Sequence, residues 1–168
     1  MDKNQKTIIS ALALVFALML GALVVLPAAL ERGSVVGEFV KPDFDSAAVS
    51  GTPQPDAALQ FAWLQIGDNI RAGMCGQPTY SKEGVQLFFA SDATNTAWLL
   101  VKILDEDGNE LGSSGLIRPG EYVTFVQLKK PIKGETKATI RILSYAPDTY
   151  YSLGSASANV RIKQASAE

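Results

Sequence analysis

The hydrophobic positions of this 168-residue chain fall into two contrasting patterns. Residues 7–30 form an unbroken run without a charged side chain, TIISALALVFALMLGALVVLPAAL. From about residue 58 onward, short apolar runs alternate with polar positions and turn-forming residues. The first pattern is typical of a membrane-spanning helix and the second of a β domain. Residues 1–6 are then a short tail, residues 31–57 a linker, and residues 58–168 the folded domain.

The long apolar run predicts an uncleaved transmembrane helix. At 1.5 Å per residue, a helix of this length covers about 36 Å, enough to cross a hydrocarbon core of about 30 Å with some tilt. A cleaved secretory signal is the alternative, but signal cores are usually shorter, and Leu26 or Pro27 would stand three residues before the cut. Lys3 and Lys6 precede the run, which favours a cytoplasmic N-terminus and a C-terminal domain outside the cell.

Small residues recur within this run at every fourth position, at Ala13, Ala17 and Gly21. They share one face of a helix and allow a second helix to approach closely, which favours self-association or pairing with another membrane helix. The alternative is that alanine and glycine are simply common in membrane spans. The partners predicted for this segment are membrane lipid and, through these three positions, a second helix.

The chain after residue 58 predicts a set of short strands and no long helix. Val85, Leu87 and Phe89 alternate onto one face, as in a strand with one buried side. Residues 97–104 are apolar on both faces, which predicts a central strand. The expected strands are 59–66, 70–75, 85–90, 97–104, 110–117, 122–128, 138–145 and 157–163. This pattern favours an all-β fold, an immunoglobulin-like antiparallel β-sandwich, with a β-barrel as the alternative.

The segment between the two patterns predicts a flexible linker. Residues 31–57 have scattered apolar positions without a period, and the sequence GTPQP at 51–55 favours extended, solvated backbone. Docking of Phe39 or Phe44 onto the domain is the alternative.

Composition restricts the chemistry that this chain can perform. It has no histidine, which excludes histidine-based acid–base catalysis and histidine metal sites. Thirteen basic and sixteen acidic residues follow residue 30, so the excess of positive charge typical of nucleic-acid binding is missing. Cys75 is the single cysteine; we interpret it as a buried apolar side chain, with a nucleophile or an intermolecular disulfide as alternatives. We therefore expect no enzyme, no metal and no cofactor.

Two loops are predicted to be turns, and the first of them resembles a calcium-binding motif. Residues 105–109 gather acidic side chains, yet the glycine and the last acidic position do not match a calcium-binding loop. Asp107-Gly108 instead indicates a hairpin turn. In the second loop, residues 118–121, Pro119 and Gly120 have the order that a type II turn requires.

Three tyrosines at the end of the predicted sheet are the candidate binding residues. Tyr145, Tyr150 and Tyr151 lie in or next to one loop, where their rings suit a sugar or a protein partner. The alternative is that they cover the end of the sandwich, with one hydroxyl bonded to the backbone.

Several short motifs in the second half of the chain resemble a group of small proteins of clostridia-type Gram-positive bacteria. They are Cys75-Gly76-Gln77-Pro78, Leu104-Asp105-Glu106-Asp107-Gly108-Asn109, Gly115-Leu116-Ile117-Arg118-Pro119-Gly120-Glu121-Tyr122 and Tyr150-Tyr151-Ser152. The resemblance implies one N-terminal anchor, one exported β domain of unassigned function and a place in a Gram-positive envelope.

The sequence therefore predicts a single-pass membrane protein whose exported β domain is a protein-binding or scaffolding module. A cell-wall or glycan-binding module that uses the three tyrosines is the alternative. An enzyme that relies on carboxylates or on Cys75 is disfavoured, since neither has an evident activating partner.

Overall fold

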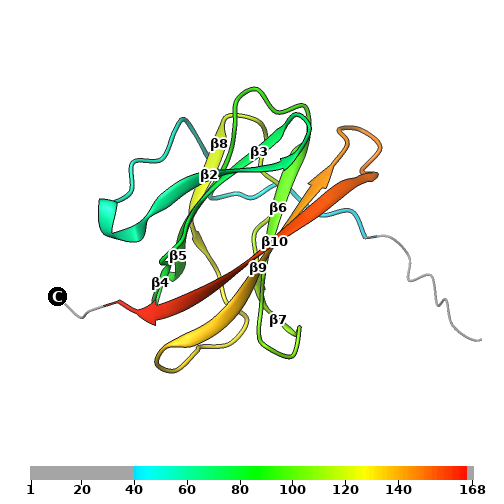
Figure 1. Cartoon of the computed structure of the whole chain (residues 1–168). Coiled ribbons are helices and arrows are strands. Elements are labelled where there is room, and N and C mark those ends of the chain that lie inside the picture. The colour runs from blue at the N-terminus through cyan, green and yellow to red at the C-terminus, as the bar shows by residue number, and fades with distance from the viewer. Residues whose placement is uncertain (1–39, 166–168) are drawn as a thin grey trace, which may run out of the picture. The chain divides into compact units, whose positions relative to one another are not determined.

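The computed structural model describes residues 40–165, which form ten β-strands and one 3₁₀ turn, with no α-helix in this range (Figure 1). The all-β expectation is confirmed. The elements are β1 (Val49–Ser50), η1 (Ala57–Leu59), β2 (Phe61–Gly67), β3 (Ile70–Cys75), β4 (Thr79–Ser81), β5 (Gly84–Ser91), β6 (Trp98–Leu104), β7 (Glu110–Ser113), β8 (Glu121–Val126), β9 (Thr136–Tyr145) and β10 (Ser152–Gln164).

The predicted membrane span falls outside the described residues. This applies to residues 7–30 as a whole and to the helix-packing positions Ala13, Ala17 and Gly21. Between residues 40 and 165, no helix has the length and apolar character needed to cross a membrane.

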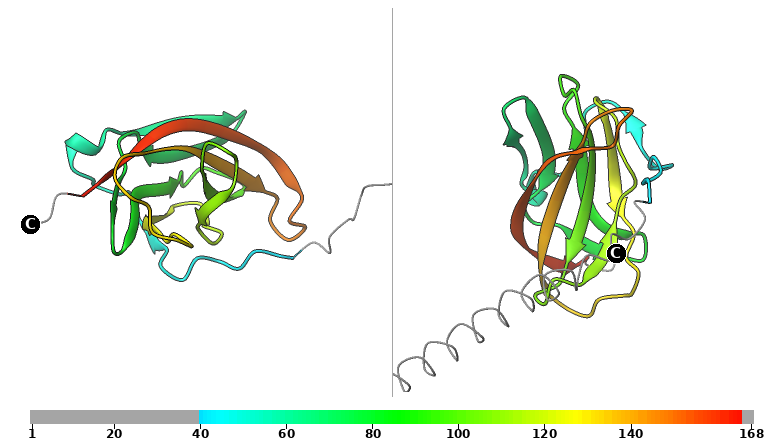
Figure 2. Two further views of the ribbon diagram at one scale, coloured as in Figure 1. Left: turned by 90° about the horizontal axis from the view of Figure 1, so that it is seen from below. Right: turned by 90° about the vertical axis from the view of Figure 1, so that its right-hand side faces the viewer.

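The strands form one curled sheet with two halves (Figure 2). In the first half the order is β1-β8-β5, then β3 and β4 one after the other along the far edge of β5, with β2 outside β3. In the second half the order is β10-β9-β6-β7. Neighbouring strands within each half are antiparallel, and a parallel pairing between β4 and the end of β10 joins the halves.

Strand β4 makes this junction because it pairs on both of its edges. On one edge it is antiparallel to the start of β5. On the other edge Thr79 and Tyr80 pair with Lys163 and Gln164 of β10. The edge that β4 offers to β10 is the same edge that β3 offers to β2, so β2 and β10 follow one another along the β3–β4 segment.

Apolar side chains from the inner faces of the two halves form one core. The predicted alternation in β5 is confirmed, because Val85, Leu87 and Phe89 are all fully buried. The second half contributes Leu99, Val101, Ile103, Ile140, Ile142 and Ile162, each almost entirely buried. Removing an aliphatic or aromatic side chain of this size from water contributes about 1.5–3 kcal/mol, so this layer supplies most of the drive for folding.

The predicted strands match most of the observed ones, although β10 begins at Ser152 and not at the predicted residue 157. β3 has the predicted bounds, whereas β1 and β4 were not predicted because two or three residues carry no readable alternation. The run expected at 110–117 ends at Ser113. Leu116 and Ile117 instead form single bridges to Phe44 and Leu99.

Residues 43–51 correct the expectation of a flexible linker over 31–57, because they pair with the domain. Val49 and Ser50 form β1 against β8. The backbone N–H of Leu116 donates to the carbonyl of Asp43 at 2.8 Å, and the N–H of Gly115 donates to the carboxylate of Asp45 at 2.8 Å. The folded unit therefore begins near residue 41, well before the predicted boundary at residue 58.

Gly115 allows residues 41–51, the N-terminal segment of the folded unit, to approach this closely. A Cβ atom on Gly115 would lie 2.5 Å from the backbone nitrogen and 2.6 Å from the Cα of Asp45. Contacts this short cannot be accommodated without moving one of the two segments apart.

We expect Gly115→Ala to lower the free energy of unfolding by about 1–3 kcal/mol, the usual effect of overpacking. The matched control is Gly67→Ala, where the nearest atom to the new Cβ is Ile70 Cδ1 at 3.6 Å, an ordinary contact. Denaturant unfolding of the full chain measures both variants. Equal effects at the two glycines would contradict the docking of residues 43–45.

Candidate functional site

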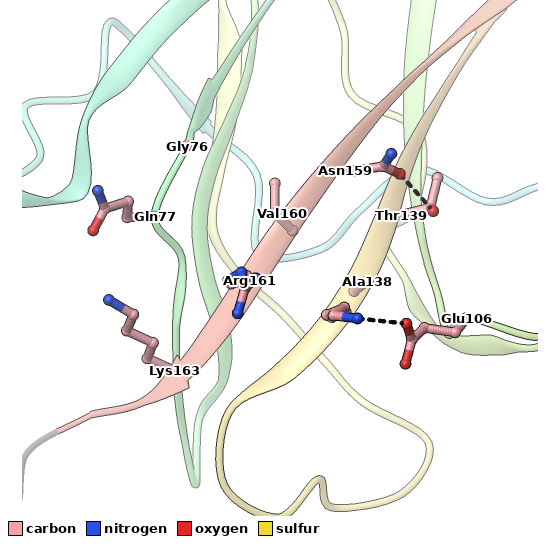
Figure 3. Close-up of a pocket in the computed structure, with 10 residues that line it drawn as sticks. Gly76, Gln77, Glu106, Ala138, Thr139, Asn159, Val160, Arg161 and Lys163 are labelled. Atoms are coloured by element: carbon pink, nitrogen blue, oxygen red, sulfur yellow. Dashed lines mark hydrogen bonds and ion pairs between the residues drawn. The ribbon is translucent and has the colours of Figure 1, made fainter.

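A polar groove of about 580 Å³ lies on the outer face of β9 and β10 (Figure 3). One rim is the β3–β4 connection with Gly76 and Gln77, and the other rim is Glu106 in the β6–β7 turn. The floor consists of alternating residues of the last two strands. The full lining is Gly76, Gln77, Glu106, Lys137, Ala138, Thr139, Asn159, Val160, Arg161 and Lys163.

Strand alternation and register gather these polar side chains. Thr139 lies directly opposite Asn159 across the β9–β10 ladder, and Lys137 lies opposite Arg161. Side chains of directly paired residues project to the same face. Ala138 and Val160 between them are buried, so the polar residues take the outer face. The Thr139 hydroxyl donates to the Asn159 side-chain oxygen at 3.1 Å.

The groove has an excess of positive charge. Lys137 forms an ion pair with Glu106 at 3.2 Å, and Arg161 forms one with Glu135 at 2.9 Å. Among the described residues, Lys163 has no carboxylate within ion-pair distance. These exposed pairs are weak in water, so both cations remain available to a partner. The groove can therefore accept carboxylates, backbone carbonyls or other anionic groups.

The three predicted binding tyrosines do not line this groove. Tyr150 is half-buried and packs edge-to-face on Trp98, with ring centroids 5.1 Å apart. Lys41 Nζ lies 4.3 Å from the centre of the Tyr150 ring. Tyr145 pairs with Trp98 in the β6–β9 ladder, whereas Tyr151 is 75% exposed. Only Tyr151 therefore presents most of its ring to solvent.

Trp98 connects this tyrosine to the docked N-terminal segment. Its ring also packs edge-to-face with Phe44, with centroids 4.8 Å apart, and the guanidinium carbon of Arg118 lies 3.7 Å from the centre of the Phe44 ring. These contacts form a row of three aromatic rings with a cation at each end, in the order Lys41, Tyr150, Trp98, Phe44 and Arg118. Aromatic and cation–π contacts of this kind contribute about 0.5–1.5 kcal/mol each, so Tyr150 has a structural role here.

Cys75 lies at the end of β3 and is fully buried. Desolvation by this burial raises the pKa of its thiol to about 11. The thiolate is the reactive form of cysteine, so at neutral pH this side chain is almost entirely unreactive. The placement matches the interpretation of Cys75 as a buried apolar residue.

The acidic residues 105–109 form the predicted turn. The Asp105 carboxylate accepts hydrogen bonds from the side chain and the backbone N–H of Asn109 and from the N–H of Asp107. These bonds, the Asn109 side chain first, lower the pKa of Asp105. Gly108 has φ +83°, the left-handed conformation that glycine adopts without strain. Across residues 40–165, no three metal-ligating side chains come together.

Residues 118–121 also form the turn that the sequence predicts. The N–H of Glu121 donates to the carbonyl of Arg118 at 3.1 Å, and Gly120 has φ +78°. This turn places Arg118 where it stacks on Phe44.

Comparison with protein-family models, with curated proteins and with solved structures finds no match to this chain.

Sequence reasoning did not find the groove. Its polar residues alternate with apolar ones in the last two predicted strands, which is ordinary for a sheet with one solvated face. What makes them a site is the register of β9 with β10 and the approach of Gln77 from a connection 82 residues before Asn159. Neither the register nor this approach has a local sequence signal.

We expect Cys75 to resist alkylation by iodoacetamide in the folded protein at pH 7–8, because its thiol is buried and protonated. Modification should proceed at the rate of a free thiol once denaturant unfolds the domain, and mass spectrometry measures both. Rapid modification under native conditions would contradict the burial of Cys75.

The stability of the domain should depend on Glu110 at acid pH. Its carboxylate lies 2.7 Å from Lys102 Nζ and 2.8 Å from Lys129 Nζ, and hydrogen bonds from these two lysines, Lys102 first, lower its pKa from 4.5 to about 2. A carboxylate with a depressed pKa stabilises the folded state above its unfolded pKa and loses that effect as the pH falls. We expect the contribution of Glu110 to be complete above pH 4.5 and gone near pH 2.

Glu110→Gln tests this expectation, because the amide keeps the shape of the side chain without its charge. The difference in unfolding free energy between the native chain and the variant should shrink as the pH falls from 5 to 2. Glu106→Gln is the control, since Glu106 forms one exposed ion pair and its pair contributes little in water. A pH-independent difference for Glu110→Gln would refute the assignment.

Proposed function

We propose that this chain is a single-pass membrane protein of a Gram-positive envelope whose exported domain binds another envelope protein or acts as a scaffold. Residues 7–30 are the proposed anchor, the N-terminus is cytoplasmic, and the β domain lies outside the cell. The polar groove on β9 and β10 is the proposed contact surface. This groove is the observation that carries the proposal.

The anchor rests on the length and apolar character of residues 7–30, and the orientation rests on Lys3 and Lys6. Moving charged side chains into the bilayer is costly, whereas apolar side chains such as those of residues 7–30 are stable there. We therefore expect the chain to remain in the membrane fraction.

An immunoglobulin-like arrangement is the proposed fold of the domain, and the strand pairings support it. The order β4-β5-β8 matches strands A, B and E of one immunoglobulin sheet, and the order β10-β9-β6-β7 matches strands G, F, C and C′ of the other. The domain differs in two additions: β2 and β3 extend the first sheet, and β1 comes from the N-terminal segment.

A protein partner fits the groove better than an apolar ligand does. The groove presents side-chain amides, a hydroxyl and cations over a broad surface. Such groups are typical of the polar, solvent-accessible periphery of a protein–protein interface. Its positive excess favours a partner surface with exposed Asp or Glu side chains.

A photoreactive amino acid at Gln77, on the groove rim, tests this function in living cells that produce the full chain. We expect a cross-linked adduct with one envelope protein. The substitution Lys163→Glu should lower the yield by about fivefold, which corresponds to an exposed ion pair of ~1 kcal/mol. The matched control carries the photoreactive group at Thr94, an exposed loop residue outside the groove, and should give no adduct.

Three outcomes would count against the proposal. These are adducts of equal yield from Gln77 and Thr94, an adduct indifferent to Lys163→Glu, and recovery of the intact chain in the cytosolic fraction. Retention of the protein on cell-wall polysaccharide that is lost in Tyr151→Ala would favour the alternative, a glycan-binding module.

A further inference from the structure

One edge of β10 presents unpaired backbone groups. The N–H groups of Lys163 and Ala165 donate to Pro78 at 3.2 Å and Tyr80 at 2.9 Å, on the side facing β4. Backbone groups of alternate residues in a strand point to the same side, and the register with β9 is regular from Gly154 to Ile162. The N–H and C=O groups of the preceding odd-numbered residues therefore point to the same edge.

Over residues 155–159 this edge has no strand beside it within the described part of the chain. β4 pairs with β10 at Lys163 and Gln164 only. The start of β2 reaches the β3–β4 connection, where the N–H groups of Gly76 and Gln77 donate to Gln60 and Leu59. β2 pairs with β3, and no described strand pairs with residues 155–159 of β10 on this edge. Ser155, Ser157 and Asn159 are all exposed.

This open stretch has none of the features that usually protect an edge strand. Natural sheets block their edges with charged side chains, prolines or bulges, because an unprotected edge pairs with other chains. Residues 155–159 read SASAN, without charge or proline. The register shift in this strand lies earlier, between Ser152 and Gly154.

The open stretch is complementary to itself in an antiparallel arrangement. With Ser157 on a two-fold axis, Ser155 of each copy lies opposite Asn159 of the other, and Ala156 lies opposite Ala158. Polar residues then meet on the outer face and alanines on the inner face, with no like charges opposite each other. Arg161 falls beside Leu153 of the second copy, whose side chain is 51% exposed.

We propose that β10 pairs with β10 of a second copy of this chain, antiparallel and centred on Ser157, so that the sheet continues across a two-fold axis. Each copy would contribute the three N–H and three C=O groups of Ser155, Ser157 and Asn159. The inference deepens the scaffolding role and rests on it. A symmetric contact of this kind closes on itself and gives a dimer.

Single cysteine substitutions test both the contact and its register. Opposed residues in a hydrogen-bonded antiparallel pair have Cα atoms about 5.5 Å apart, within the range of a disulfide. In Ser157→Cys the two new thiols meet at the axis. In Ser155→Cys, the matched control on the same face of the same strand, the two thiols are about 14 Å apart and cannot bond. The buried Cys75 stays in every variant.

The full chain in mild detergent is oxidised and analysed on a non-reducing gel. We expect Ser157→Cys to give at least about tenfold more disulfide dimer than Ser155→Cys. Mixing the Ser155→Cys and Asn159→Cys chains should restore cross-linking, since these positions are opposed. Adding Ser155→Pro to Ser157→Cys should abolish it, because proline removes an N–H at the open edge and leaves the β9 ladder intact.

Equal cross-linking of Ser157→Cys and Ser155→Cys, or none in either, would overturn the proposal without needing the proline variant to fold. Trapping of Ser157→Cys in whole membranes with another protein, and not with itself, would assign the edge to a different partner and also overturn it. If the protein is a monomer and still gives the Gln77 adduct, the dimer proposal fails and the proposed envelope-binding function keeps its support. A dimer without that adduct would contradict the groove alone.

Discussion

The fold depends on the parallel pairing between β4 and the end of β10. All other named strands pair antiparallel within one half of the sheet, and only this contact joins the halves edge to edge. It consists of backbone hydrogen bonds from Lys163 and Ala165 to Pro78 and Tyr80. By fixing the end of β10 beside the β3–β4 connection, it brings the Gly76–Gln77 rim over the groove. It also determines which edge of β10 stays open.

The N-terminal segment is the second constraint on the domain. Its contacts combine a close backbone approach at Gly115 with the row of aromatic and cation–π contacts from Lys41 to Arg118. Tyr150 packs against Trp98 in this row and so helps to hold the segment in place, whereas Tyr151 remains exposed. The polar groove on the outer face of β9 and β10 is separate from this row.

Strand positions could be predicted from the sequence because alternation is a local property. Val85, Leu87 and Phe89 reveal their strand without any knowledge of its neighbours, and the turns at Gly108 and Gly120 are equally local. β4 escaped prediction because its importance lies in its two partners and not in its three residues. The docking of residues 43–51 was not predicted for a related reason. It depends on a close backbone approach that a side chain at position 115 would block.

The polar groove could not be predicted from the sequence for the same physical reason, and the predicted tyrosines lie elsewhere. Aromatic residues in a loop suggest binding, but Tyr150 is committed to Trp98 once the register of β6 and β9 is set. In the sequence, Thr139 and Asn159 look like ordinary solvated positions. Only the register of β9 with β10 places them together.

The contact that closes the sheet uses main-chain groups alone. The side chains at positions 163 and 165 take no part in this contact. During evolution, either residue can therefore be replaced by almost any residue except proline without separating the two halves of the sheet. Selection on this closure acts on strand direction and spacing. The architecture can therefore outlast recognisable similarity in its amino-acid sequence.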